Sequence, residues 1–332
     1  MVTKHSESRP TARLFDADRT DQQFELSAEA VRSVGDRQLL WVDVTVADDG
    51  TDREALLTML PFGTEEVTAQ WASTSGPRLT VHGDYFLARV VVLPSKGAAD
   101  AGIPVDLAVG KNVVLTAHRQ PVDFLAEINS RITADTTLGE IDAADFATVL
   151  LEGLVTSYLE LTDAILAEVD ELDRQALKAT GKRDLLTDLV DLRHRIASAR
   201  RVLVAHRPVV AGVAGADFKI ATRTDEDAAA RFAALTDHFE GAIRAIDGAR
   251  EALIGTFDIH SSRTAQRTND VMKVLTITSV LLLPTGVIAG FMGMNIKAPY
   301  TNDDPTIFWF VVAGIVIIAV VTLAMLRIRR WL

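Results

Sequence analysis

The residues with the clearest chemistry lie near the C-terminus, where the sequence reads Gly293-Met294-Asn295. A carboxamide and the neighbouring backbone carbonyls are neutral oxygen donors, and they suit a cation that keeps its water shell. Mg²⁺ is the extreme example, because it gives up its water reluctantly. One chain offers one such carboxamide, so a site of this kind requires several chains arranged around a common axis.

The segment before this motif carries a stripe of small or polar residues on one face of the expected helix. Counted from Asn269 in steps of three and four, this small-residue stripe contains Met272, Thr276, Ser279, Leu283, Gly286, Gly290 and Gly293. Such residues are unusual on a lipid-facing surface, which favours a water-filled pore. Gly286 and Gly290 also form a small-xxx-small pattern, so a tight helix–helix contact without a pore is the alternative.

Two uncharged stretches, residues 274–296 and 305–326, indicate the elements that position this stripe. Each is as long as the ~20 residues that a helix needs to cross a hydrocarbon core. Cations lie before the first stretch and after the second. Because cationic flanks stay on the cytoplasmic side, we expect a multi-pass protein of the inner (plasma) membrane with both termini in the cytoplasm. The first residues lack the apolar core of a secretory signal.

The charge of the chain separates the membrane part from the rest. The net charge is −11, yet residues 271–332 contain five Lys and Arg against two Asp. The remainder is strongly acidic, which repels nucleic acid and phosphates and attracts cations. No cysteine is present, and the seven histidines show no metal-ligand spacing. We therefore expect neither an enzyme nor a partner that is a nucleic acid or a nucleotide.

The soluble part is predicted to begin with a mixed α/β domain that ends near residue 135. Apolar and β-branched runs predict strands over Gln38–Val46, Arg78–Val81, Tyr85–Leu93, Val105–Val109 and Asn112–His118. Helical patterns are interspersed over Asp52–Leu60 and Val122–Ile132. The polar segment 1–37 is expected to be flexible.

Long amphipathic helices are predicted to follow as a stalk. Apolar residues recur at three- and four-residue spacing over 143–178 and 184–207, and Pro208 marks the next connection. From Asp225 no proline appears until Pro284, so one helix is expected to run from there into the first membrane span. The predicted parts are 38–135 (α/β domain), 136–270 (helical stalk), 271–295 (first span, pore-lining), 296–304 (outer loop), 305–326 (second span) and 327–332 (basic tail).

Several of these motifs together resemble the CorA magnesium transporter family. Gly293-Met294-Asn295 ends the first of two C-terminal spans, as in that family. The runs Asn269–Thr276, Leu40–Val44 and Ile288–Gly290 are similar as well, as are Asp191-Leu192-Arg193 and Arg200-Arg201. The likeness extends from about residue 38 to the C-terminus.

The resemblance implies a funnel-shaped homopentamer in the lipid bilayer that conducts divalent cations passively, driven by the membrane potential. Mg²⁺ is the expected ion, with cobalt and nickel as further candidates, and no cofactor is expected. Gly293, Met294 and Asn295 would form the outer selectivity ring, with Asn295 meeting the metal through ion-bound water. The residues implied to line or gate the pore are Asn269, Met272, Leu275, Thr276, Ser279, Leu283, Gly286 and Gly290. Asp258 would lie at the inner pore entrance.

Two departures from the family pattern leave selectivity and regulation open. The loop after the motif reads IKAPYTNDDP rather than an acidic Met-Pro-Glu-Leu-like sequence, so Asp303 and Asp304 would have to attract cations instead. Relatives use acidic pairs between cytoplasmic domains as regulatory Mg²⁺ sites; the stalk position falls here on Ala234, with Asp237 and Glu240 nearby. A zinc or broad transition-metal transporter, and a membrane-anchored scaffold or sensor without a pore, are the alternatives.

Overall fold

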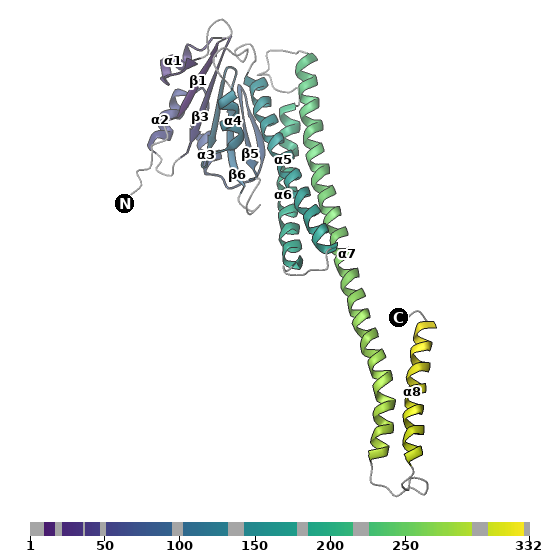
Figure 1. Ribbon diagram of the computed structural model, residues 1–332. Coiled ribbons are helices and arrows are strands. Elements are labelled where there is room, and N and C mark those ends of the chain that lie inside the picture. Colours follow the sequence, from purple (N-terminus) through teal and green to yellow (C-terminus); the bar gives the residue numbers. More distant parts are fainter. Residues whose placement is uncertain are drawn as a thin grey trace. The chain divides into compact units, whose positions relative to one another are not determined.

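A computed structural model of the chain describes residues 10–16, 22–35, 37–46, 51–94, 102–131, 143–177, 185–214, 226–293 and 305–328. The chain divides into two compact units, Met1–Thr256 and Phe257–Leu332. The described part of the first unit contains a sheet with helices, and that of the second contains two helices (Figure 1).

The first unit is built on a seven-stranded mixed sheet with strand order β2-β1-β3-β7-β6-β5-β4. The strands are β1 (Thr11–Asp16), β2 (Gln22–Gln23), β3 (Gln38–Thr45), β4 (Arg78–His82), β5 (Tyr85–Val92), β6 (Ile103–Val109) and β7 (Val113–His118). Only β3 and β7 pair in parallel among these strands. The five strands from Gln38 onward that the sequence predicts are confirmed, with ends within two residues.

Helices cover both faces of the sheet (Figure 1). The helices described along the whole chain are α1 (Ala28–Arg32), α2 (Thr51–Met59), α3 (Thr64–Ala72), α4 (Asp123–Arg131), α5 (Ala143–Leu177), α6 (Leu185–Ala214), α7 (Glu226–Gly293) and α8 (Pro305–Ile328), of which α8 belongs to the second unit. Side chains of α2 and α3 join one apolar core, and those of α4, α5, α6 and α7 join the other. The alternation of strand side chains between these two cores explains why the strands could be recognised from their pattern.

Two features differ from the sequence-based expectations. The sequence predicts no element before Gln38, whereas β1 pairs with β3 along its whole length and Phe15 is fully buried. Pro208 does not end α6, which continues to Ala214. Proline removes one backbone hydrogen bond from a helix, and burial of Val209, Val210 and Val213 compensates by holding this last part of α6 in the core.

The long helix expected through the first membrane span is confirmed as α7, a single helix of 68 residues. Its part within the first unit buries a residue at every third or fourth position, and the last of these is Thr256. From Phe257 to Gly293 none of the side chains with described surroundings is buried. The candidate site lies in this second part.

Candidate functional site: the exposed part of α7

The second part of α7 has the length and composition of a membrane span. Within the described residues, α7 is the one helix long and apolar enough to cross a bilayer, and a shorter apolar stretch, Trp309–Thr322, lies in α8. None of the apolar window of α7 is buried within the chain. Exposed apolar surface of this extent requires an apolar surrounding or a partner.

One face of this part of α7 is half-buried. The half-buried residues there are Lys273, Ile277, Leu281, Pro284, Thr285 and Ile288. Their spacing of three or four defines one helix face. A matching half-buried stripe on α8 contains Val311, Val312, Gly314, Ile315, Ala319 and Thr322. Figure 1 draws α8 alongside the end of α7, and we take these two stripes as the faces on which the helices pack.

The small-residue stripe lies on the other side of α7. At about 100° per residue its centre is roughly 150° around the helix from the half-buried face. Each described member, from Asn269 through Met272 and Ser279 to Gly293, is exposed, and Leu283 exposes 68% of its surface. Leu275 is exposed as well. The structure therefore places the predicted pore-lining residues on a common surface that α8 leaves open.

The glycines of the stripe have no close neighbour within the chain. A Cβ atom built on Gly286, Gly290 or Gly293 would meet nothing within 4 Å. The small-xxx-small pattern is therefore not used for packing against α8 in the described residues. This surface is therefore open to lipid, water or another copy as far as the described residues go.

The polar groups of the stripe are neutral and face outward. Thr276 Oγ1 donates to the Met272 carbonyl oxygen at 2.8 Å. This bond occupies the hydroxyl proton and leaves the oxygen lone pairs available as acceptors. Asp258 is exposed three helical turns before Asn269, on nearly the same face by helix geometry. Met294, Asn295, Asp303 and Asp304 lie outside the described residues.

Of the two stalk acids considered for a regulatory metal, Asp237 is exposed and Glu240 is paired within the chain. Glu240 on α7 forms a two-bond ion pair with Arg207 on α6, with Nε–Oε1 at 2.8 Å and Nη2–Oε2 at 2.7 Å. This arginine lowers the pKa of Glu240. The pairing partner lies 33 residues away on another helix, and no local sequence signal could have revealed it. Among the described residues, no group of three or more His, Asp or Glu side chains is arranged to hold a metal ion.

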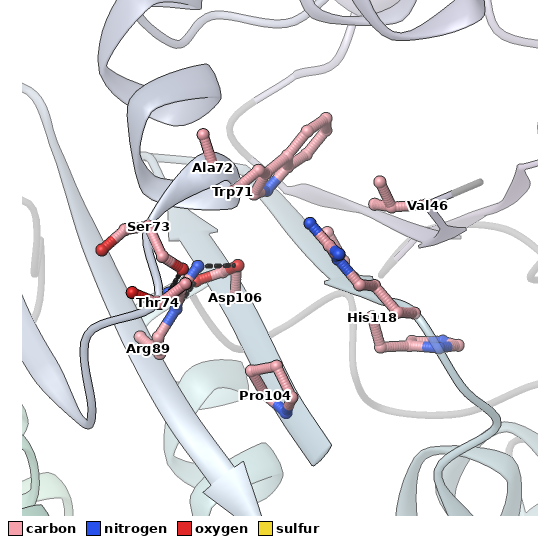
Figure 2. A pocket seen from close by; sticks show the side chains of 11 residues that line it. Val46, Trp71, Ala72, Ser73, Thr74, Arg89, Pro104, Asp106 and His118 are labelled. Carbon is pink, nitrogen blue, oxygen red and sulfur yellow. Dashed lines mark hydrogen bonds and ion pairs between the residues drawn. The ribbon is translucent and has the colours of Figure 1, made fainter. Parts of the chain in front are cut away.

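A separate cavity of about 180 Å³ lies in the first unit, at the ends of β3 and β7. Figure 2 shows Arg89 and Asp106 joined on one wall, with Trp71 and Val46 above and beside them. Arg89 Nε and Nη2 bind the two Asp106 carboxylate oxygens at 2.7 and 2.8 Å. Its remaining N–H groups donate to the carbonyl oxygens of Gln70, Ser73 and Ser75.

All five N–H groups of Arg89 therefore have protein acceptors. The guanidinium caps the C-terminal carbonyls of α3 and fastens that helix to the sheet. These hydrogen bonds within the chain explain why the charged Arg89 is buried at the cavity wall, and no ligand is needed to explain it.

Comparison with known proteins connects this architecture to a family. The model of the family described as "CorA-like Mg2+ transporter protein" matches residues 36–330. The chain is 27% identical over 241 residues to the cobalt/magnesium transport protein CorA of Thermotoga maritima, an alignment covering 69% of this chain and 64% of that relative's length. It is 22% identical over 307 residues to the protein of the same name from Methanocaldococcus jannaschii, covering 90% and 93% of the two chains.

Among solved structures, the complete structure of the CorA magnesium transporter from Methanocaldococcus jannaschii has the same fold. The TM-score is 0.79 at 20% sequence identity, and the match covers 97% of this chain and 98% of the other. The similarity includes both the sheet-containing unit and the two C-terminal helices.

Proposed function

The chain belongs to the CorA-like Mg²⁺ transporter family, and on this premise we propose that it carries divalent cations, magnesium foremost, across a membrane through a pore formed by several copies of the chain. The observation that supports this proposal is the small-residue stripe, which α8 leaves exposed along the apolar part of α7. Two helices cannot enclose a conduit, so the pore walls come from symmetry-related copies. Five copies are expected from the family resemblance.

The chemistry of the stripe favours an ion that keeps its water. The proposed lining from Asn269 to Gly293 offers carboxamide, hydroxyl and backbone oxygen atoms and contains no charged member. Neutral dipoles hold a hydrated dication weakly enough to release it, which conduction requires. The Asn295 ring would be the outermost of these contacts and would touch the ion through its water.

The driving force needs no nucleotide. Moving one charge through 100 mV is worth about 2.3 kcal/mol, so a dication gains about twice that. Uptake into a cell with a negative interior is therefore favoured. Leu283, which is strongly exposed on the stripe, would close the pore as an apolar constriction that excludes water.

The ion preference separates this proposal from a zinc or broad transition-metal transporter. Zinc prefers imidazole and thiolate ligands, whereas the chain contains no cysteine and no histidine between residues 261 and 332. A membrane-anchored scaffold or sensor is the other alternative. It would have no need for a small, polar stripe on the face away from α8.

The test is ion flux into liposomes that contain the purified full-length protein, with Mg²⁺, Co²⁺, Ni²⁺ and Zn²⁺ compared under an inside-negative potential. We expect Mg²⁺ to enter, and we expect Asn295→Ala to abolish that entry without changing the oligomeric state. Asn302→Ala, the same exchange in the outer loop, is the matched control and should transport normally. Absence of flux for every ion would support the scaffold. Wild-type flux in Asn295→Ala would show that Asn295 does not form the selectivity ring.

A further inference from the structure

Strand β5 extends beyond its neighbour at one edge of the sheet. The pairing of β4 with β5 ends at Arg78 and Arg89, so residues 90–92 have no strand partner on that side within the part of the chain that the structure describes. On the other side Val91 lies opposite Pro104 of β6. Proline has no N–H group, which fits a position where the backbone groups of Val91 point away from β6. These groups need other partners, because buried backbone N–H and C=O groups are nearly always bonded.

Two side chains from different helices supply those partners. The Val91 N–H donates to Nε2 of His206 on α6 at 2.9 Å. The hydroxyl of Tyr158 on α5 donates to the Val91 carbonyl oxygen at 2.5 Å. Both residues are buried, with His206 at 0% and Tyr158 at 1% exposure. A donor and an acceptor thus meet the strand in the way that a residue of a further strand would.

The arrangement requires a neutral His206. Its Nδ1 lies 2.7 Å from the Val202 carbonyl oxygen and acts as the donor there, which makes Nε2 the acceptor for Val91. Protonation would place a second N–H on Nε2, directly against the N–H of Val91. Burial without a charged partner lowers the pKa of His206 to about 4.

The described surroundings of His206 contain no compensating charge. Tyr158 is the titratable group in contact with it, and burial raises the pKa of that phenol. The nearest acidic residues along α5, Glu152, Glu160 and Asp163, are exposed. On β5, Arg89 donates to α3 and Asp106 on the opposite face. On α6, Arg207 is paired with Glu240.

We propose that Tyr158 and His206 form a clasp that stands in for a missing edge strand at the end of β5, and that protonation of His206 opens it. With the clasp closed, the sheet is hydrogen-bonded directly to α5 and α6 and moves with them. With the clasp open, the end of β5 keeps only its apolar contacts to these helices. The clasp is independent of the transported ion.

The test is hydrogen exchange measured by mass spectrometry on the full-length protein in nanodiscs, followed in peptides that cover residues 85–92. Rates at pH 7 and pH 4.5 are corrected for the intrinsic pH dependence of exchange. In the wild type we expect at least about tenfold faster exchange of the Val91 region at pH 4.5, because the open state binds a proton more tightly. His206→Gln retains an acceptor near the position of Nε2 but cannot titrate, so this acid-induced step should disappear.

Two further variants complete the design. Tyr158→Phe removes the donor to the Val91 carbonyl and should speed exchange at both pH values. His194→Gln lies on the exposed side of the same helix and should behave as the wild type. Unchanged protection of β5 in the wild type at pH 4.5, or an acid step that survives in His206→Gln, would overturn the proposal. If His206→Gln does not fold, the wild-type pH comparison together with Tyr158→Phe decides by the same criteria.

Discussion

The two parts of α7 are one helix but have opposite surroundings. Up to Thr256 the helix buries Leu235, Phe239, Ile243 and Ile246 among others, and its acids pair with arginines of α6. After Thr256 it exposes equally apolar residues, such as Phe257 and Leu283. The first part is explained by contacts within one chain. Apart from the face that we assign to α8, the second is explained by what lies outside the chain, which in our proposal is lipid, water and neighbouring copies.

The largest difference between the two parts should appear in the free energy of unfolding when a phenylalanine is replaced by alanine in each part. Phe239 is 1% exposed and Phe257 is 52% exposed. Phe239→Ala leaves a cavity in the core and should lower the free energy of unfolding by about 3–5 kcal/mol. Phe257→Ala should change it by less than about 0.5 kcal/mol. Urea unfolding in detergent, followed by far-UV circular dichroism, measures both changes. Equal effects would mean that Phe257 is buried in the assembled protein.

The first unit, in which the first part of α7 is packed, should also be sensitive to acid through the contact of His206 on α6 with the sheet. The pKa of His206 is lowered in the folded protein to about 4, against 6.5 in the unfolded chain. The unfolded chain therefore binds the proton first, so the contribution of His206 is complete above pH 6.5 and is lost as the pH falls toward 4. At 1.36 kcal/mol per pKa unit the loss is roughly 3 kcal/mol.

Urea unfolding at pH 7, 5.5 and 4.5 measures how the free energy of unfolding falls as the pH is lowered. This pH dependence should be weaker in His206→Gln, while it should be unchanged in His194→Gln. A pH dependence that is the same in His206→Gln and in the wild type would assign the acid sensitivity to other groups.

In the second part, Leu283→Gly should affect transport rather than stability. Removing the apolar side chain widens and hydrates the proposed constriction, so resting Mg²⁺ flux into liposomes should rise severalfold. Val316→Gly, at an exposed apolar position on α8, is the control and should leave flux unchanged. If Leu283→Gly shows wild-type flux, Leu283 is not the gate, and the constriction lies at another residue of the small-residue stripe.

The smallest effect should come from the ion pair between α6 and α7. The side chains of Arg207 and Glu240 are 49% and 32% exposed, and solvent-exposed pairs contribute roughly 0–1 kcal/mol. A double-mutant cycle with Arg207→Ala and Glu240→Ala should give a coupling energy within that range, decreasing with salt. A markedly larger coupling would show that the pair is shielded from solvent in the assembled protein.

The sequence was sufficient wherever a local pattern determines the structure. Strands β3 to β7 were predictable because their side chains alternate or are buried on both faces, and the small-residue stripe because a helix has a fixed period. Strand β1 was missed because TARLFD is short and carries charges at Arg13 and Asp16. The continuation of α6 past Pro208 depends on core contacts that no helix-stop signal includes.

Contacts between distant residues could not be predicted from patterns. The bond between Val91 and His206 joins residues 115 positions apart, and the pair Arg207–Glu240 joins two helices. The face of α7 that packs on α8 was likewise unknown, because the apolar residues of the span surround the helix on several sides. The structure resolves this point by leaving the small-residue stripe open.

The most direct test of the central claim uses the absence of cysteine from the chain. Single substitutions Ser279→Cys and Gly286→Cys lie on the stripe, and Ile277→Cys lies on the half-buried face close to the depth of Ser279. In the reconstituted protein, a charged, membrane-impermeant thiol reagent should label the two stripe positions and block Mg²⁺ flux, while Ile277→Cys stays unlabelled and active. If the stripe positions resist the reagent in a protein that conducts, or if all three positions react alike, the stripe does not line a shared aqueous pore.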